Sequence, residues 1–241
     1  QNFNNPLDNK QKLINKDKEL ELADLVLVPS IFVKETLKKS KIDKKKIFVL
    51  PYGFPKVNKH KKKFFDKKNK LKLLYVGRLT EDKGINYLIK AITKLNINHK
   101  NKISVCIIGA GPLESLVKKK LPDAIFMKNL QHKLILNEMQ KNDVLIFPSL
   151  YEGFGLVISE AMSRGMNVIS TFRTALADIG HKNNSFLISP DSSDEIVNKI
   201  NFLLKNPSHF KKIGKNAMIT ASKYNWAEYQ KKLITIINTN L

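Results

Sequence analysis

Two glutamates, Glu152 and Glu160, bracket a stretch in which two glycines give way to a helical pattern. An apolar run over residues 143–147 precedes them and is typical of a buried strand. After Gly155 the apolar residues recur at helical spacing, and the pattern stops at Gly165, where a glycine commonly ends a helix. The sequence therefore predicts a strand, a glycine-rich loop and a helix in direct succession.

The predicted loop is suited to a phosphorylated ligand. Glycines allow a ligand to approach the backbone closely, and the start of a helix offers free N–H groups and a positive dipole end to phosphate. The flanking carboxylates are suited to sugar hydroxyls. Glutamates at this spacing often occur by chance on a helix face, but Pro148-Ser149 before them and Gly-Phe-Gly between them make chance a poor explanation. The combination predicts a site for a sugar nucleotide.

Arg78 and Lys83 follow a second apolar run, residues 71–76, at five-residue spacing. Arginine is rare in this lysine-rich chain, in which the others are Arg164 and Arg173. An arginine at position 78 therefore indicates a need for a planar, bidentate donor. Two cations beside a phosphate-binding loop fit a diphosphate leaving group. The alternative is an ordinary pair of surface cations.

Glycines also follow the apolar run 103–108, in Gly109-Ala110-Gly111. This motif lacks the third glycine of a dinucleotide fingerprint, so a plain tight turn before a helix, with Pro112 as its first residue, is an equal alternative. The candidate binding loops nevertheless share one property: each follows a predicted strand. In a parallel sheet these strand ends lie at one edge, where ligands bind.

The remaining pattern alternates strands with helices, which predicts an α/β fold with a doubly wound, Rossmann-like parallel sheet. The predicted strands are 22–28, 47–50, 71–76, 103–108, 124–127, 143–147, 167–171 and 185–188. The predicted helices begin near 30, 85, 112, 132, 156, 192, 207 and 225. Cys106 lies within one of these strands, and we expect it to be a small core residue.

The 241 residues carry a net charge of +22, which raises the alternative of a non-catalytic basic module that binds nucleic acid or anionic membrane. Nearly all of the cations are lysines with few aromatic residues among them, so a surface that reads bases is not indicated. Attraction to acidic lipids stays a hypothesis. No run of 18 apolar residues predicts a transmembrane helix, and the chain begins with Gln1 rather than Met.

From Asp24 onward, the chain resembles the retaining glycosyltransferases of family 4, which have the GT-B fold of two facing doubly wound domains. The motifs that carry this resemblance are Gly77-Arg78-Leu79 with Lys83-Gly84, Gly109-Ala110-Gly111-Pro112, Pro148-Ser149 and the segment from Glu152 to Ala161. Ser30, Pro51-Tyr52-Gly53 and Trp226 also fall where the family has similar residues.

The resemblance implies a UDP- or GDP-sugar donor, a glycan or lipid-linked acceptor, and no metal or other cofactor. It implies that Glu152 sits at the donor sugar, that Glu160 binds the ribose hydroxyls, and that Arg78 and Lys83 stabilise the departing diphosphate. Glu152, Arg78 and Lys83 are thus the predicted catalytic residues. The predicted donor-binding residues are Gly77, Gly109, Gly111, Asn129, Leu130, Pro148, Ser149, Gly153, Phe154, Gly155, Leu156, Val157 and Glu160.

The same resemblance divides the chain into a remnant of the acceptor-binding domain (1–53), a lysine-rich linker (54–70), the donor-binding domain (71–224) and a C-terminal helix (225–241) that we expect to pack back toward the first domain. Because most of the first domain is absent, we expect little transferase activity from this chain alone. Lys128 stands where the family often has a glycine, which affects the preferred base. An epimerase of similar fold is a rival that the Gly-Phe-Gly segment disfavours. We expect a cytoplasmic protein, peripheral at the inner membrane face, with no specific nucleic-acid partner.

Overall fold

The computed structural model describes residues 10–38, 42–57, 65, 68–99 and 101–241. Its larger sheet has six strands, all paired in parallel, in the order β5-β4-β3-β6-β7-β8. The strand order reverses between β3 and β6, so the loops that follow these strands open outwards from one crevice. The strands are β3 (Leu71–Val76), β4 (Ile103–Ile108), β5 (Ile125–Met127), β6 (Val144–Phe147), β7 (Asn167–Thr171) and β8 (Phe186–Ile188).

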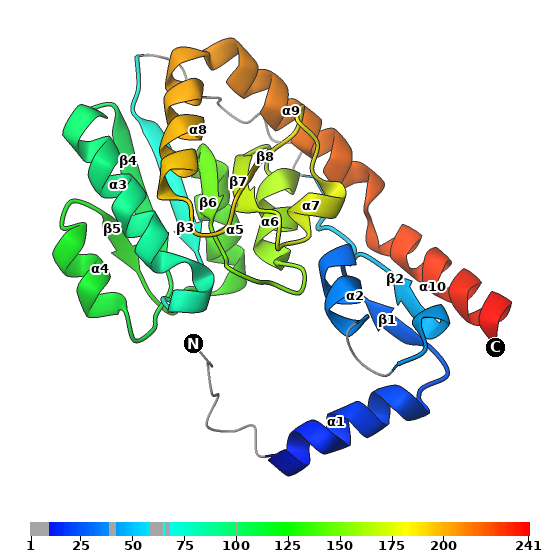
Figure 1. Cartoon of the computed structure of the whole chain (residues 1–241). Coiled ribbons are helices and arrows are strands. Elements are labelled where there is room, and N and C mark those ends of the chain that lie inside the picture. The colour runs from blue at the N-terminus through cyan, green and yellow to red at the C-terminus, as the bar shows by residue number, and fades with distance from the viewer. Residues whose placement is uncertain (1–9, 39–41, 58–64, 66–67, 100) are drawn as a thin grey trace.

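Helices cover both faces of this sheet, which confirms the predicted doubly wound α/β fold (Figure 1). On one side α3 packs against α4 and α8, and on the other α6 packs against α5 and α9. The helices are α3 (Ile85–His99), α4 (Glu114–Lys120), α5 (His132–Lys141), α6 (Leu156–Ser163), α7 (Leu176–Ile179), α8 (Ser193–Lys205) and α9 (Pro207–Lys223).

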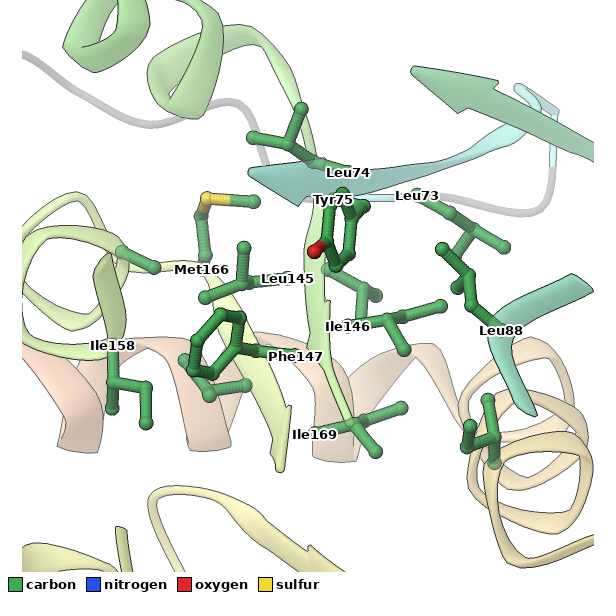
Figure 2. Close-up of a cluster of buried hydrophobic side chains, with 14 of the residues drawn as sticks. Leu73, Leu74, Tyr75, Leu88, Leu145, Ile146, Phe147, Ile158, Met166 and Ile169 are labelled. Atoms are coloured by element: carbon green, nitrogen blue, oxygen red, sulfur yellow. The ribbon is translucent and has the colours of Figure 1, made fainter. Parts of the chain in front are cut away.

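The core extends to both faces of the central strands because successive side chains of a strand point in opposite directions. Figure 2 shows Leu145 and Ile146 of β6 in this core, together with Leu88 from α3 and Ile158 from α6. All four side chains are buried. Burying one such side chain stabilises a fold by about 1.5–3 kcal/mol, so the central strands are rigid supports for the loops at their ends.

Cys106 belongs to the same core, as predicted, and its burial raises the pKa of the thiol to about 11.

A smaller unit precedes this domain in the sequence. Its two strands, β1 (Val26–Val28) and β2 (Ile47–Val49), pair in parallel and are connected through α2 (Ile31–Leu37) and the short 3₁₀ helix η1 (Lys44–Lys46). The last helix, α10 (Trp226–Asn240), leaves the large domain and extends alongside this unit (Figure 1).

The structure departs from the predicted elements at three places. The strand predicted from Leu22 begins only at Val26, because Leu22 is the exposed last residue of a helix, α1 (Lys10–Leu22), that was not predicted. Pro112 does not open α4, since it lies in a turn in which Leu113 N–H donates to the carbonyl of Leu79, 3.0 Å away. Helix α7 was not predicted either.

The lysine-rich connection lies largely outside the described residues, which exclude 58–64 and 66–67. Phe54 and Phe65, within that span, are buried with the core of the large domain. Among the described parts of the chain, no helix is both long and apolar enough to cross a membrane.

Candidate functional site

The carboxyl ends of β3 and β4 approach each other so closely that only glycine fits. Gly77 N–H donates to the carbonyl of Ile108 at 3.0 Å, and a Cβ on Gly109 would lie 1.9 Å from the carbonyl oxygen of Gly77. Gly111 in turn packs against the backbone of Leu79. These predicted site glycines therefore allow the loops after β3 and β4 to pack closely against each other.

The loop after β6 ends at Gly155, which has a φ of 80° and directly precedes the first residue of α6. An L-residue with a side chain is strained in this left-handed conformation, so the turn into the helix depends on glycine. Among the residues that the structure describes, no side chain caps the start of α6. Its first N–H groups therefore remain available to a ligand, together with the positive end of the helix dipole.

Lys83 and Glu152 are 69 residues apart in the sequence and form the closest ion pair of the crevice. Lys83 Nζ lies 2.6 Å from Glu152 Oε2 and 3.7 Å from Asp82 Oδ2. The side chains of Lys83 and Glu152 are only 14% and 23% exposed. An ion pair that is largely withdrawn from water is held more strongly than one at the surface.

The turn that carries Lys83 is fixed against the loop after β6. It consists of the 3₁₀ helix η2 (Glu81–Lys83) and Gly84. Leu150 N–H donates to the carbonyl of Asp82 at 2.8 Å, and a Cβ on Gly84 would lie 1.9 Å from the carbonyl oxygen of Pro148. The backbone thus holds Lys83 beside Glu152.

A pocket of about 470 Å³ opens at this ion pair. Of the predicted site residues, Gly77, Lys83 and residues 152–157 line it. Pro29 and Tyr52 from the smaller unit complete its wall, although only the large domain was predicted to bind the donor. A larger cavity, of about 630 Å³, lies at the opposite end of the sheet near Lys102, and none of the predicted site residues lines it.

Arg78 lies at the rim rather than in the lining of this pocket. Its side chain is 73% exposed, and its Nη2 atom is 3.8 Å from Asp82 Oδ2. The backbone below it is well fixed, because the hydroxyl of Tyr75 donates to the carbonyl of Arg78 at 2.6 Å. Burial of this phenol is the main reason that its pKa is raised far above the usual range.

The other predicted carboxylate, Glu160, lies one turn further into α6 and contacts a histidine that was not predicted. His132 Nε2, at the start of α5, is 2.7 Å from Glu160 Oε1. Glu160 is only 15% exposed, whereas His132 is 64% exposed. Nothing in the spacing of His132 distinguishes it in the sequence, because the pair depends on how α5 and α6 pack.

The remaining predicted residues support the site or border it. Ser149 is fully buried, and its hydroxyl lies 3.0 Å from the carbonyl oxygen of Tyr151. Pro148 is buried next to it. Asn129 has a φ of 50° in the loop after β5, and Leu130 packs partly against the core. These four residues do not line the pocket, so a ligand bound in the pocket would contact them only at its border.

The smaller unit is hydrogen-bonded directly to the glycine-rich loop. The buried Ser30 hydroxyl, which caps α2, donates to the carbonyl of Gly153 at 2.7 Å. Ile31 N–H donates to Asp178 Oδ2, also at 2.7 Å. Burial raises the pKa of Asp178, and the hydrogen bond from Ile31 offsets part of that rise. The start of α2 is thereby attached to the glycine-rich loop and to helix α7 of the large domain.

Aromatic rings make a second connection between the two units. The ring centroid of Tyr52 lies 5.2 Å from that of Phe154, inside the glycine-rich loop, and 6.5 Å from that of Trp226 on α10. Aromatic contacts of this kind add stability beyond the area they bury. The loop that holds Glu152 is therefore supported from both the smaller unit and the C-terminal helix.

The part of the chain that forms most of this site matches a known sequence family. The sequence model of the family described as glycosyl transferases group 1 matches residues 56–219, which is more than half of the chain. The chain belongs to this family. The matched region contains the pocket loops of the large domain, the Lys83–Glu152 pair and the Glu160–His132 pair.

Curated relatives of this group 1 glycosyltransferase chain include two examples of different origin. The uncharacterized glycosyltransferase MJ1607 of Methanocaldococcus jannaschii is 31% identical over 176 residues, which cover 68% of the chain and 44% of the relative. The sulfoquinovosyl transferase SQD2 of Arabidopsis thaliana is 29% identical over 160 residues, which cover 64% of the chain and 30% of the relative. The chain thus spans less than half the length of either relative.

Solved structures confirm the predicted fold class. Sucrose-phosphate synthase from Thermosynechococcus elongatus matches with a TM-score of 0.81 and 22% identity, over 99% of this chain and 64% of that one. HepE from Anabaena, solved in complex with UDP, matches with a TM-score of 0.80 and 19% identity, over 97% of this chain and 69% of that one. The six-stranded parallel sheet with its helices is that of GT-B glycosyltransferases.

Proposed function

We propose that this chain supplies the donor site of a retaining, family 4 glycosyltransferase that transfers a hexose-type sugar from UDP or GDP to a glycan or lipid-linked acceptor. The observation that carries the proposal is the Lys83–Glu152 ion pair, 2.6 Å long, at the start of an uncapped helix in a pocket of about 470 Å³. HepE, whose fold this chain shares, has been solved with UDP and with UDP-glucose.

The proposed chemistry follows from where the charges lie. The first turn of α6 and Lys83 attract the diphosphate, and they stabilise the negative charge that develops as the sugar leaves. Glu152 is paired with Lys83 and therefore lies beside the proposed diphosphate. From there its carboxylate can face the sugar carbon, which becomes positive in an oxocarbenium-like transition state. In retention, the acceptor attacks from the face that the diphosphate leaves.

Two further parts of the proposal concern the surroundings of the site. No metal is required, because Lys83, Arg78 and the helix dipole supply the positive charge. The enzyme is proposed to act in the cytoplasm, on the inner membrane face. Holding two reactants in position can contribute about 7–11 kcal/mol to catalysis. This chain covers 44% of MJ1607 and was predicted to hold only a remnant of the acceptor-binding domain. We therefore expect it to bind the donor but to transfer slowly by itself.

Isothermal titration calorimetry with UDP and GDP tests the proposal. We expect one of the two to bind in the micromolar range or tighter, and Arg78→Ala to weaken it about 10- to 150-fold, because a hydrogen bond to a charged group contributes about 1.5–3 kcal/mol. Lys94→Ala, which removes a half-exposed lysine on α3 paired with Asp194, is the matched control and should bind like the wild type.

Two results would contradict this expectation in different ways. Failure of the wild-type chain to bind either nucleotide would remove the donor site altogether. Equal affinities of the wild type and the Arg78→Ala variant would keep the donor site but exclude Arg78 from it.

A further inference from the structure

Glu160 is the carboxylate proposed to bind the ribose, and one of its two oxygens is already engaged. Glu160 Oε1 lies 2.7 Å from His132 Nε2, while Glu160 itself is 15% exposed. A carboxylate has two oxygens that can each accept more than one hydrogen bond. The imidazole therefore leaves Oε2 and part of Oε1 for ribose hydroxyls.

The nearby guanidinium of Arg164 does not replace this contact. Arg164 Nη1 donates to the carbonyl of Lys56 at 3.2 Å and to Ser163 Oγ at 2.7 Å. Burial lowers the pKa of Arg164, and attraction to Glu160 offsets part of that change. Among the contacts between described residues, His132 is thus the direct hydrogen-bond partner of the Glu160 carboxylate.

The position of His132 in the chain adds a second reason to link it to the nucleotide. It is the first residue of α5 and follows the loop that contains Asn129 and Leu130, two of the predicted donor-binding residues. One short segment therefore carries both these residues and the partner of Glu160. A residue at this place can fix Glu160 relative to that loop as well as relative to α6.

We propose that His132 is a positioning residue of the ribose subsite: it holds one oxygen of Glu160 so that the other meets the ribose hydroxyls. This inference rests on the proposed function. It predicts that loss of His132 reduces the recognition of hydroxyls rather than nucleotide affinity in general. A histidine that only stabilised the surface would affect nucleotides with and without hydroxyls equally.

Calorimetry on the full chain with UDP and 2′,3′-dideoxy-UDP separates these two cases, with the corresponding guanine pair used if GDP binds tighter. We expect the wild type to prefer UDP by about tenfold or more, as for loss of hydrogen bonds to a charged group. Glu160→Gln should remove most of that preference. His132→Ala should lower it about threefold or more while leaving the affinity for the dideoxy nucleotide unchanged.

Two further variants make the test specific. In the double variant His132→Ala/Glu160→Gln, the preference should equal that of Glu160→Gln, because residues that act through one another are not additive. His209→Ala, which removes an exposed histidine on α9 that contacts Phe202, should keep the wild-type preference.

The inference is overturned if His132→Ala keeps the wild-type preference for UDP, or if it weakens both nucleotides by the same factor. It is also overturned if Glu160→Gln retains the preference, since Glu160 would then not be the ribose ligand. Failure of the wild type to bind either UDP or GDP is a distinct result, because it would remove the proposed function on which the inference rests.

Discussion

Glu152 and Glu160 have the same side chain but different partners. Glu152 pairs with a lysine inside the pocket, whereas Glu160 contacts a histidine on a neighbouring helix outside it. A carboxylate beside the diphosphate region can respond to charge that develops during the reaction. The role proposed for Glu160, further along α6, is at a part of the donor that does not change during the reaction, so we expect it to contribute to binding in the ground state as well.

This difference predicts that the two glutamates affect different kinetic quantities in the complete enzyme. Glu152→Gln should lower kcat by about 10²–10³, the usual effect of removing one preorganised electrostatic group, with little change in UDP affinity. Glu160→Gln should mainly weaken UDP. Steady-state kinetics together with UDP titrations of both variants measure the two effects. Intact turnover in Glu152→Gln, combined with lost turnover at unchanged affinity in Glu160→Gln, would reverse the assignment.

Much of this residue-level arrangement could be predicted from the sequence, because parallel strands bring their following loops together. Lys83 and Glu152 were assigned to one site on that basis, and they are in contact. Side-chain placement could not be predicted in the same way. Arg78 is directed into solvent and Ser149 is buried, since their surroundings depend on packing between loops. His132 escaped prediction because an exposed histidine at a helix start has no distinguishing pattern.

At the scale of elements, α2 is attached to the glycine-rich loop by the buried hydroxyl of Ser30. Ser30→Ala removes the donor to Gly153 and the cap of α2, which should lower the free energy of unfolding by about 1–3 kcal/mol. Urea unfolding followed by circular dichroism measures the change. Ser222→Ala, at an exposed serine whose hydroxyl contacts only its own helix, is the control and should differ from the wild type by less than about 0.5 kcal/mol. Equal losses in both variants would show that the α2 contact is not specific.

The second attachment of α2 predicts a pH effect. Because burial raises the pKa of Asp178, the folded state binds its proton more tightly than the unfolded state does. This group therefore favours folding at low pH, and its contribution is lost as the pH rises from the ordinary aspartate pKa, about 3.9, through the raised value. Asp178→Asn keeps an acceptor for Ile31 but does not ionise.

The free energies of unfolding of wild type and Asp178→Asn, measured in urea from pH 4 to pH 7, test this sign. Their difference should shift in favour of the asparagine variant as the pH increases. A constant difference would mean that Asp178 titrates normally, and a shift towards the wild type would mean that its pKa is lowered in the folded chain.

Elements with a clear period were the predictable ones. Strands β3, β4 and β7 and helix α5 have the predicted boundaries, because apolar residues predominate in the strands and recur at turn spacing in the helix. Helix α7 has four residues, which is about one turn and too short to display a helical period. In α1 the few apolar residues have no regular three- or four-residue spacing, so its sequence shows no amphipathic pattern from which the helix could be predicted.

At the scale of the whole molecule, the pocket is a shared structure. The large domain provides the glycine-rich loop and Lys83, while Pro29 and Tyr52 come from the smaller unit. Hydrogen bonds from Ser30 and Ile31 and the contact of Tyr52 with Trp226 hold these parts together. The sequence predicted the parallel sheet and a C-terminal helix that packs toward the first domain, but not that Pro29 and Tyr52 line the pocket, because contacts between units depend on surfaces that have no period of their own.

The net charge of +22 is also a property of the whole molecule, and it predicts peripheral binding to anionic membranes. A lysine near an acidic bilayer contributes about 1 kcal/mol, and the attraction is screened within a Debye length of about 10 Å at 0.1 M salt. The chain should therefore sediment with phosphatidylcholine vesicles that contain 30% phosphatidylglycerol at 50 mM NaCl, and should be released at 0.5 M. Pure phosphatidylcholine vesicles are the control. Equal binding to both vesicles would point to apolar insertion, and no binding to either at low salt would show that the lysines do not direct the protein to a lipid surface.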